Sequence, residues 1–297
     1  MIRLGLLDFD TSHVVQFARR LNHQGIKEDE WVDGARIVVA CPGQSRIMPE
    51  VIPGYLAEIK KLAIPLVDRP EDMIGKVDGM LIESQQGSVH YERARPFLEA
   101  GIPCYIDKPF TCSVADAHKI IDLAANKRVP IFSTSSLRYA PDLIKFLAEP
   151  AHRPILGAIS YGPGTLHPGN PGLFHYGIHA TELLYTIIGP GCQTVVCSSQ
   201  KYVDVATGQW RDGRIASVRG IRAGKRDYGC LIFTERSIHA LPVGTNYIYR
   251  ELLKQIVSMF AAGKAPLDIH ETLEIVAFIE AALRSTHNHG TTQRLEL

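Results

Sequence analysis

The chain has 297 residues, and at roughly 150 residues per domain this length predicts two domains. Its 32 Lys and Arg against 31 Asp and Glu give a net charge of +1, so no bulk field favours nucleic acid or an anionic membrane as a partner. The apolar content of 45% and charged content of 21% exclude disordered, collagen-like and coiled-coil classes and are typical of a globular protein.

Targeting and redox signals point to the cytoplasm. The first apolar run is too short for a signal peptide, because Asp8 and Asp10 interrupt it. The longest uncharged stretch, 154–181, is rich in Gly and Pro and does not read as a membrane span. The 6 cysteines have no CxxC spacing, so we expect buried free thiols in a reducing compartment rather than a zinc site or disulfides.

Residues 1–137 alternate short apolar runs with helical patterns. This alternation indicates βαβ units and predicts a doubly wound parallel sheet. The expected strands are 2–7, 36–40, 64–67, 78–82, 104–106 and 130–132. The expected helices are 12–21, 53–62, 71–74, 89–100 and 114–125.

Residues 138–297 have a different pattern and predict a second, α+β domain. Consecutive strand-like runs with short turns indicate an open, mostly antiparallel sheet, with one apolar face that a monomer would leave wet. The expected strands are 155–161, 194–197, 215–221, 228–233 and 237–241, and the expected helices are 143–147, 176–188, 248–261 and 271–284. The uncovered face predicts a homodimer or homotetramer.

Polar clusters follow five of the strands expected in the first domain. In open parallel sheets, ligands bind beyond the carboxyl ends of the strands. The clusters comprise residues 8–13, 41–46, 83–86, 107–109 and 133–136. We therefore expect a ligand crevice along this edge of the sheet.

Two segments carry a family resemblance. The run Ile82-Glu83-Ser84, then His90, the turn 100–103 and Asp107-Lys108-Pro109-Phe110 resemble the run ending in E-K-P of the glucose–fructose oxidoreductase/inositol dehydrogenase (Gfo/Idh/MocA) family. Gly177-Ile-His179-Ala-Thr-Glu182 is similar to that family's G-x-H-x-x-D helix. The resemblance implies a Rossmann-like dinucleotide-binding domain over 1–137, a substrate and oligomerisation domain over 138–297, and NAD or NADP as cofactor. It also implies hydride transfer from a sugar-like or cyclitol hydroxyl.

This chemistry assigns roles to two residues. Alcohol oxidation needs a hydride acceptor, a base and a positive charge near the oxygen. Lys108, at the end of an apolar strand, suits the positive charge, although it can also be read as a surface lysine. The imidazole of His179 can accept a proton at neutral pH, although it can also be read as a capping or core histidine. The dehydrogenase hypothesis requires Lys108 and His179 to meet at one reacting carbon.

Three further residues are expected to bind substrate: Arg138, His175 and Glu182. Glu182 lies on the same helix face as His179 and either orients it or faces solvent. Arg138 is either a crevice residue or a linker arginine. His175 replaces the carboxylate that the family places there; with His179 and Glu182 it has a spacing that could ligate a metal, but a further ligand is not evident, and we expect no metal.

The first turn departs from the family pattern. Asp8, Asp10 and His13 occupy the three glycine positions of G-x-G-x-x-G. A carboxylate within about 4–6 Å of a diphosphate would cost a few kcal/mol. Thr11 or Ser12 can cap the following helix. The residues expected to contact the cofactor are Asp8, Asp10, Thr11, Ser12, His13, Ser45, Arg46, Glu83, Ser84, His90, Asp107 and Lys108.

The missing glycines leave several possibilities open. The aspartates point away from a bound cofactor, the cofactor binds weakly through another anchor, or the site has been lost. Arg46 suits the 2′-phosphate of NADP, or it is an exposed arginine. The alternative function is a non-catalytic binding or sensing protein for a neutral polyol or an amine. A metal-dependent lyase or hydrolase that uses His175 and His179 is a more distant alternative.

Overall fold

The computed structural model describes all 297 residues and divides the chain into two compact units. Unit 1 comprises Met1–Thr111, Ala115–Thr134 and Tyr249–Ile269, and unit 2 comprises Cys112–Val114, Ser135–Ile248 and His270–Leu297. The segment 249–269, which we expected in the second domain, therefore belongs to unit 1. The reason is packing: Phe260 lies so close to Gly79 that a Cβ there would come within 2.5 Å of its ring.

The sheet of unit 1 is parallel and five-stranded, which confirms the predicted fold class. Its order is β2-β1-β3-β4-β5, with β1 at Ile2–Leu7, β2 at Ala35–Cys41, β3 at Gly79–Ile82, β4 at Cys104–Ile106 and β5 at Ile131–Phe132. The expected strand at 64–67 is reduced to one parallel bridge between Ala40 and Leu66. Pro65 has no amide hydrogen, which limits the ladder there.

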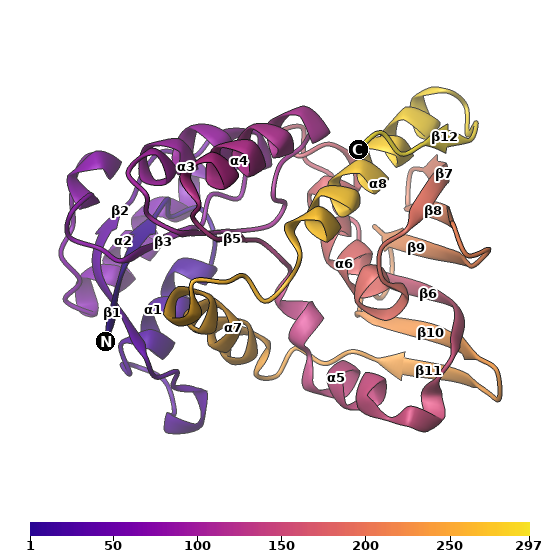
Figure 1. Cartoon of the computed structure of the whole chain (residues 1–297), viewed down its shortest axis with the longest axis horizontal. Helices are drawn as coiled ribbons and strands as arrows, with labels where there is room; N and C mark the ends of the chain where they lie inside the picture. Colours follow the sequence, from indigo (N-terminus) through magenta and orange to yellow (C-terminus); the bar gives the residue numbers. More distant parts are fainter. The chain divides into compact units, whose positions relative to one another are not determined.

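The helices of unit 1 cover both faces of its sheet. In Figure 1, α3 and α4 lie on one side and α1 and α7 on the other. These helices are α1 at His13–Leu21, α2 at Ile52–Lys61, α3 at His90–Glu99, α4 at Val114–Lys127 and α7 at Ile248–Ala262. The amphipathic pattern explains α1, whose Val14, Phe17 and Leu21 are buried. The helix expected at 71–74 is a 3₁₀ turn, Pro70–Met73.

Unit 2 contains a seven-stranded sheet that is mostly antiparallel, as predicted. Its order is β11-β10-β6-β9-β8-β7-β12, and only β6 and β9 pair in parallel. The strands are β6 at Ile155–Pro163, β7 at Cys192–Gln200, β8 at Val203–Trp210, β9 at Ile215–Ile221, β10 at Gly229–Thr234, β11 at Ile238–Pro242 and β12 at Gln293–Arg294. Neither β8 nor β12 was predicted from the sequence.

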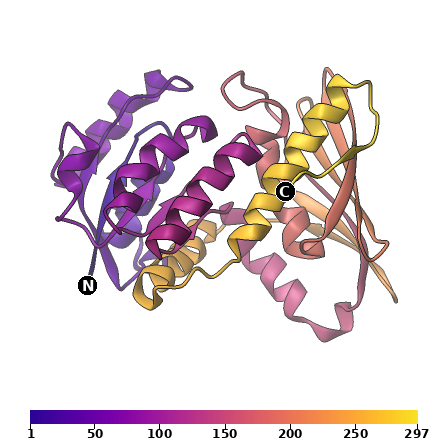
Figure 2. The same ribbon diagram turned by 45° about the horizontal axis from the view of Figure 1, so that its top comes forward.

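Helices cover one face of the sheet in unit 2. Figure 2 shows α6, Gly177–Ile188, and α8, Ile269–His287, against this face, while α5 spans Pro141–Ala148. Tyr185 of α6, Trp210 of β8 and Phe278 of α8 contact one another through their rings. This aromatic cluster forms the core between helices and sheet.

The opposite face of this sheet exposes apolar side chains. Gly157 of β6 pairs with Ile215 and with Phe233, and Phe233 pairs with Ile238, so these positions share one face. Ile215 and Ile238 are 55% and 69% exposed.

None of the helices combines the length and the apolar character needed to cross a membrane.

Candidate functional site

A cleft lies at the carboxyl ends of β1, β2 and β3 in unit 1, where the sequence predicts a ligand crevice. Its volume is about 430 Å³. It is lined by residues that follow these strands and by the start of α3: Asp10, Gln44, Ser45, Arg46, Ser84, Gln86, Ser88, Val89, Glu92 and Arg93. Four residues predicted to contact the cofactor, Asp10, Ser45, Arg46 and Ser84, are therefore brought together.

Asp8 does not line this cleft itself, but its side chain bonds to two residues that do, Ser84 and Arg93. Its φ of +64° lies in the region that glycine favours, so the backbone keeps the conformation expected at the first glycine position. Its Oδ2 accepts hydrogen bonds from the Ser84 hydroxyl and, at 2.8 Å, from Nε of Arg93. The neighbouring turn requires glycine, because a Cβ on Gly43 would lie 1.7 Å from Asp8 Oδ1.

Burial dominates the protonation of Asp8. The side chain is only 2% exposed, and the loss of hydration raises its pKa to about 6, while Arg93 and Ser84 act in the opposite direction. Asp10 has a different partner, since its Oδ1 accepts a hydrogen bond of 2.8 Å from the Gln85 amide. The two aspartates thus hold the ends of β1 and β3 together.

The start of α1 is capped only weakly. Ser12 makes no capping hydrogen bond with its side chain, and Thr11 Oγ1 accepts a long contact of 3.5 Å from the His13 amide. The predicted caps are therefore not the main anchors of this turn. Asp8 and Asp10 supply the stronger hydrogen bonds to neighbouring strand ends.

His13 is buried behind the first turn, in an ion-pair cluster at the ends of β3 and β4. Its Nδ1 lies 2.9 Å from Asp107 Oδ2 and 3.5 Å from Glu83 Oε2, and its ring stacks on Phe17. Burial alone would lower the pKa of His13, but the two carboxylates outweigh it and raise that pKa to about 10. His13 is therefore an imidazolium at neutral pH.

The two carboxylates of the cluster differ in charge state. Burial raises the pKa of Glu83 to about 7. The same burial would raise the pKa of Asp107, but His13 and Lys108 hold it well below its usual range. Asp107 is thus the permanent anion of the cluster, while Glu83 titrates near neutral pH.

Lys108 lies where the sequence places it, directly after β4. Its Nζ is 3.6 Å from Asp107 Oδ2, and the side chain is only 9% exposed. Its amide donates a hydrogen bond of 2.8 Å to Asp107 Oδ1. These contacts make Lys108 a buried, oriented cation and exclude its interpretation as a surface lysine.

The ligand atoms of His13, Glu83 and Asp107 lie within 4.8 Å of one another, a spacing that suits a metal ion. The charge of His13 argues against one: it is already an imidazolium beside Asp107, and a metal would have to displace its proton. The set considered from the sequence, with His175, His179 and Glu182, is a different one.

His90 does not line the cleft; its buried side chain bridges the segments that follow β3 and β4. It is 0% exposed, and its Nδ1 and Nε2 lie 2.9 Å from the Phe110 carbonyl and 2.8 Å from the Ser84 carbonyl. Burial lowers its pKa. The structure thus gives His90 a supporting role, in contrast to the cofactor contact we expected.

In unit 2, His179 lies in the first turn of α6. Its Nδ1 is 2.7 Å from the hydroxyl of Ser135, which also caps a 3₁₀ turn by accepting a hydrogen bond from Leu137. The rings of Tyr176 and Tyr228 lie beside the imidazole, with centroids 5.8 Å and 5.9 Å away. The half-buried ring is therefore oriented by Ser135, which lies in the polar cluster 133–136 but had no individual role predicted from the sequence.

Arg138 and Glu182 form a buried ion-pair network with Glu271. The distances from Arg138 are 3.0 Å to Glu182 and 2.8 Å to Glu271, and Arg138 and Glu182 are 7% and 2% exposed. Glu182 therefore does not face solvent, contrary to that alternative, and its orienting role toward His179 stays a prediction. Glu271, at the start of α8, was missed because only tertiary structure brings it to Arg138.

His175 lies just before α6. It is half-buried, with its ring 5.3 Å from that of His167 and 5.1 Å from that of Tyr176. His167 comes from the Gly/Pro-rich loop and accepts a hydrogen bond of 3.0 Å from the Gly169 amide. Substrate binding by His175 stays a prediction.

Comparison with known proteins finds sequence relatives for part of the chain and solved structures with the same fold for the whole chain. Residues 48–135 match the Gfo/Idh/MocA family, described as an oxidoreductase family with an NAD-binding Rossmann fold. YceM of Salmonella typhimurium, which is named as an oxidoreductase, is 31% identical over 78 residues, which are 26% of this chain and 25% of that protein. The match thus spans a quarter of the length of this curated relative.

Two solved structures show the same fold over the whole chain. One, from Thermotoga maritima, is described as a probable dehydrogenase; it is 15% identical, with a TM-score of 0.82 over 99% of both chains. The other is myo-inositol dehydrogenase from Lactobacillus casei, solved with NAD(H) and myo-inositol. It is 12% identical, with a TM-score of 0.80 over 100% of this chain and 97% of that one.

Proposed function

We propose that the protein is an NAD(P)-dependent dehydrogenase, because residues 48–135 match the Gfo/Idh/MocA oxidoreductase family that the motifs resemble. Its proposed reaction is hydride transfer from the hydroxyl carbon of a sugar-like or cyclitol substrate. The observation that carries the proposal is the buried Lys108 ammonium, oriented by Asp107 directly after β4. A cation held there can stabilise a developing alkoxide.

The residues of the chain have separate tasks in this reaction. The nicotinamide supplies the hydride acceptor. Lys108 binds the substrate oxygen, and His179 accepts the hydroxyl proton through Nε2, because Ser135 engages Nδ1. His175 contacts the substrate. The support from the comparisons is that the Lactobacillus casei structure contains both NAD(H) and a cyclitol.

The cleft of unit 1 is the proposed cofactor site. Arg46 and Arg93 line it and can meet phosphates, and the loop after β2 offers Ser45 and Arg46 instead of the acid that grips an adenine ribose. The Asp8 carboxylate, unlike the two arginines, would repel a diphosphate, since both are anionic. Cofactor binding therefore depends on whether Asp8 keeps its negative charge when a diphosphate enters the cleft.

Titration of the protein with NADH and NADPH, followed by nucleotide fluorescence, tests the cofactor role. We expect micromolar binding of at least one of them. Binding no tighter than about millimolar for both would refute the proposal.

With a panel of polyols and cyclitols as substrates, Lys108→Ala and His179→Ala should each lower kcat by orders of magnitude, while circular dichroism shows an unchanged fold.

One observation favours the second candidate function, a non-catalytic binding or sensing protein. The buried carboxylate of Asp8, held at the glycine position by Ser84 and Arg93, suits a neutral or cationic ligand better than a diphosphate. A protein that ignores both nucleotides but binds a polyol or an amine in calorimetry would support this function instead.

We also propose that the protein forms a homodimer or homotetramer in the cytoplasm. The apolar face with Ile215 and Ile238 supports self-association, and the 6 free cysteines support a reducing compartment. Light scattering should give a multiple of the monomer mass. We expect Ile238→Lys to shift it toward the monomer, and a clean monomer in the unaltered protein would contradict the proposal.

A further inference from the structure

We propose that Asp8 determines ligand specificity in the cleft by holding Arg93 as an internal counter-ion, and that a ligand phosphate binds by taking Arg93 over from Asp8. The inference rests on the proposed function, since it concerns how the dinucleotide enters the cleft. It identifies Arg93 as the phosphate-binding cation and Asp8 as its built-in competitor.

The Asp8–Arg93 pair lies beside the cleft, with Arg93 in its lining. Arg93 projects from α3, donates to Asp8 after β1 and reaches the Gln44 carbonyl after β2 at 3.3 Å. One guanidinium thus connects three segments around the space that a nucleotide would fill. Its side chain is 28% exposed, whereas that of Asp8 is 3% exposed, so a ligand can reach Arg93 while Asp8 stays sealed from water.

The consequence for Asp8 follows from its burial. When Arg93 turns to a phosphate, the Asp8 carboxylate keeps the Ser84 hydroxyl but loses its cation, and Asp10 lies nearby. A buried carboxylate without a cation costs several kcal/mol, and such a group takes up a proton instead. The pKa of Asp8 is already raised to about 6 by burial, so proton uptake on phosphate binding is energetically accessible.

Other charged groups near Asp8 could alter the pH dependence. Asp10 and the Cys41 thiol lie close to it, and Arg46 and Glu92 line the same cleft. Burial raises the pKa of Cys41, which keeps that thiol neutral. Comparing variants at one pH and one variant across pH separates the effect of Asp8 from these groups.

The experiment measures the Kd of NADH and NADPH by calorimetry, with the full-length protein and with Asp8→Asn. For the unaltered protein, uptake of one proton predicts that Kd rises about tenfold per pH unit above about pH 7. Asp8→Asn removes the titrating group, so its Kd should lie roughly 100-fold lower at about pH 8 and stay nearly flat. Any titration of the 2′-phosphate of NADPH is common to both proteins and cancels in the ratio.

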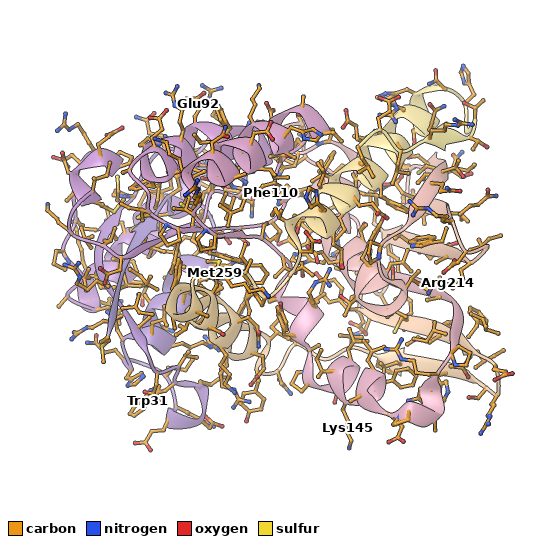
Figure 3. The ribbon with its side chains drawn as sticks, in the orientation of Figure 1. Trp31, Glu92, Phe110, Lys145, Arg214 and Met259 are labelled. Carbon is orange, nitrogen blue, oxygen red and sulfur yellow. The ribbon has the colours of Figure 1, made fainter.

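Glu99→Gln is the matched control. It removes one negative charge from the C-terminal end of α3, where Glu99 is exposed and does not line the cleft. Glu92 of the same helix is not used, because it lines the cleft although it lies on the outer side of α3 (Figure 3). We expect less than a threefold change in Kd and the same pH slope as in the unaltered protein. Calorimetry in two buffers of different ionisation enthalpy should count one proton taken up by the unaltered protein and none by Asp8→Asn.

The outcomes separate the inference from the proposed function. Nucleotide binding that does not vary with pH, with Asp8→Asn no tighter than the unaltered protein, overturns the inference and leaves the dehydrogenase proposal standing. Binding by Asp8→Asn alone supports the inference that Asp8 competes for Arg93 but refutes the dehydrogenase proposal for the unaltered protein. If no protein binds either nucleotide, the proposed function fails and the inference with it. Should Asp8→Asn misfold, Asp8→Gly replaces it, since glycine adopts the φ of +64° without strain.

Discussion

Replacing Arg138 with methionine tests whether this residue holds unit 2 together or binds substrate. Methionine keeps much of the side-chain length but leaves the carboxylates of Glu182 and Glu271 without their cation. Removing one partner of a buried ion pair costs about 3–5 kcal/mol. Because Glu271 is 14% exposed in its side chain and can recover some hydration, we expect a loss near the lower end, about 3 kcal/mol.

Urea unfolding can measure this loss in unit 2 alone. The chain has 2 tryptophans: Trp31 in unit 1, and Trp210, which is 3% exposed in the aromatic core of unit 2. In a Trp31→Phe background, fluorescence therefore reports the unfolding of unit 2. Arg214→Met is the control: Arg214 pairs with a half-exposed Asp212, and such surface pairs contribute about 0–1 kcal/mol.

The unfolding measurement distinguishes the two roles of Arg138. An Arg138→Met variant that unfolds within about 1 kcal/mol of the parent would refute the buried-network argument. Weaker ligand binding with unchanged stability would instead support the predicted role of Arg138 in substrate binding.

Three further substitutions test unit 1. The folded-state pKa of His13, about 10, lies above its unfolded value, so His13 stabilises the fold fully below about pH 6.5 and loses this contribution toward pH 10. The unfolding free energy of the unaltered protein should therefore fall by up to about 1.4 kcal/mol per pH unit in this range. In His13→Gln this fall should disappear. An equal slope in both proteins would contradict this. Gly43→Ala places a Cβ 1.7 Å from Asp8 Oδ1 at a φ of +61°, and should destabilise by at least about 1–2 kcal/mol in urea unfolding. Gly79→Ala places a Cβ 2.5 Å from the Phe260 ring and should cost about 1–3 kcal/mol; an unaffected midpoint would show that α7 does not pack there.

The sequence could predict much of the architecture because the signals are local. Strand and helix periodicity identified β1 and α1 closely, and the position of Lys108 after β4 followed from one apolar run and one polar residue. The strand expected at 64–67 was wrong for a local reason that the pattern hides: an apolar run does not reveal that Pro65 limits the ladder to one bridge.

Tertiary structure alone decided which charges meet. Asp8 and Arg93 are 85 residues apart, and Arg138 reaches Glu182 at a separation of 44 as well as Glu271 on a later helix. Hydrophobic periodicity determines which face of an element is buried, so the order of the apolar runs was sufficient to predict both sheets and the edge that carries the polar loops. Periodicity does not determine which loops lie opposite one another at that edge, because an ion pair depends on the separation of two side chains in space. Only the tertiary structure therefore showed that Arg93 pairs with Asp8 and that α7 packs in unit 1.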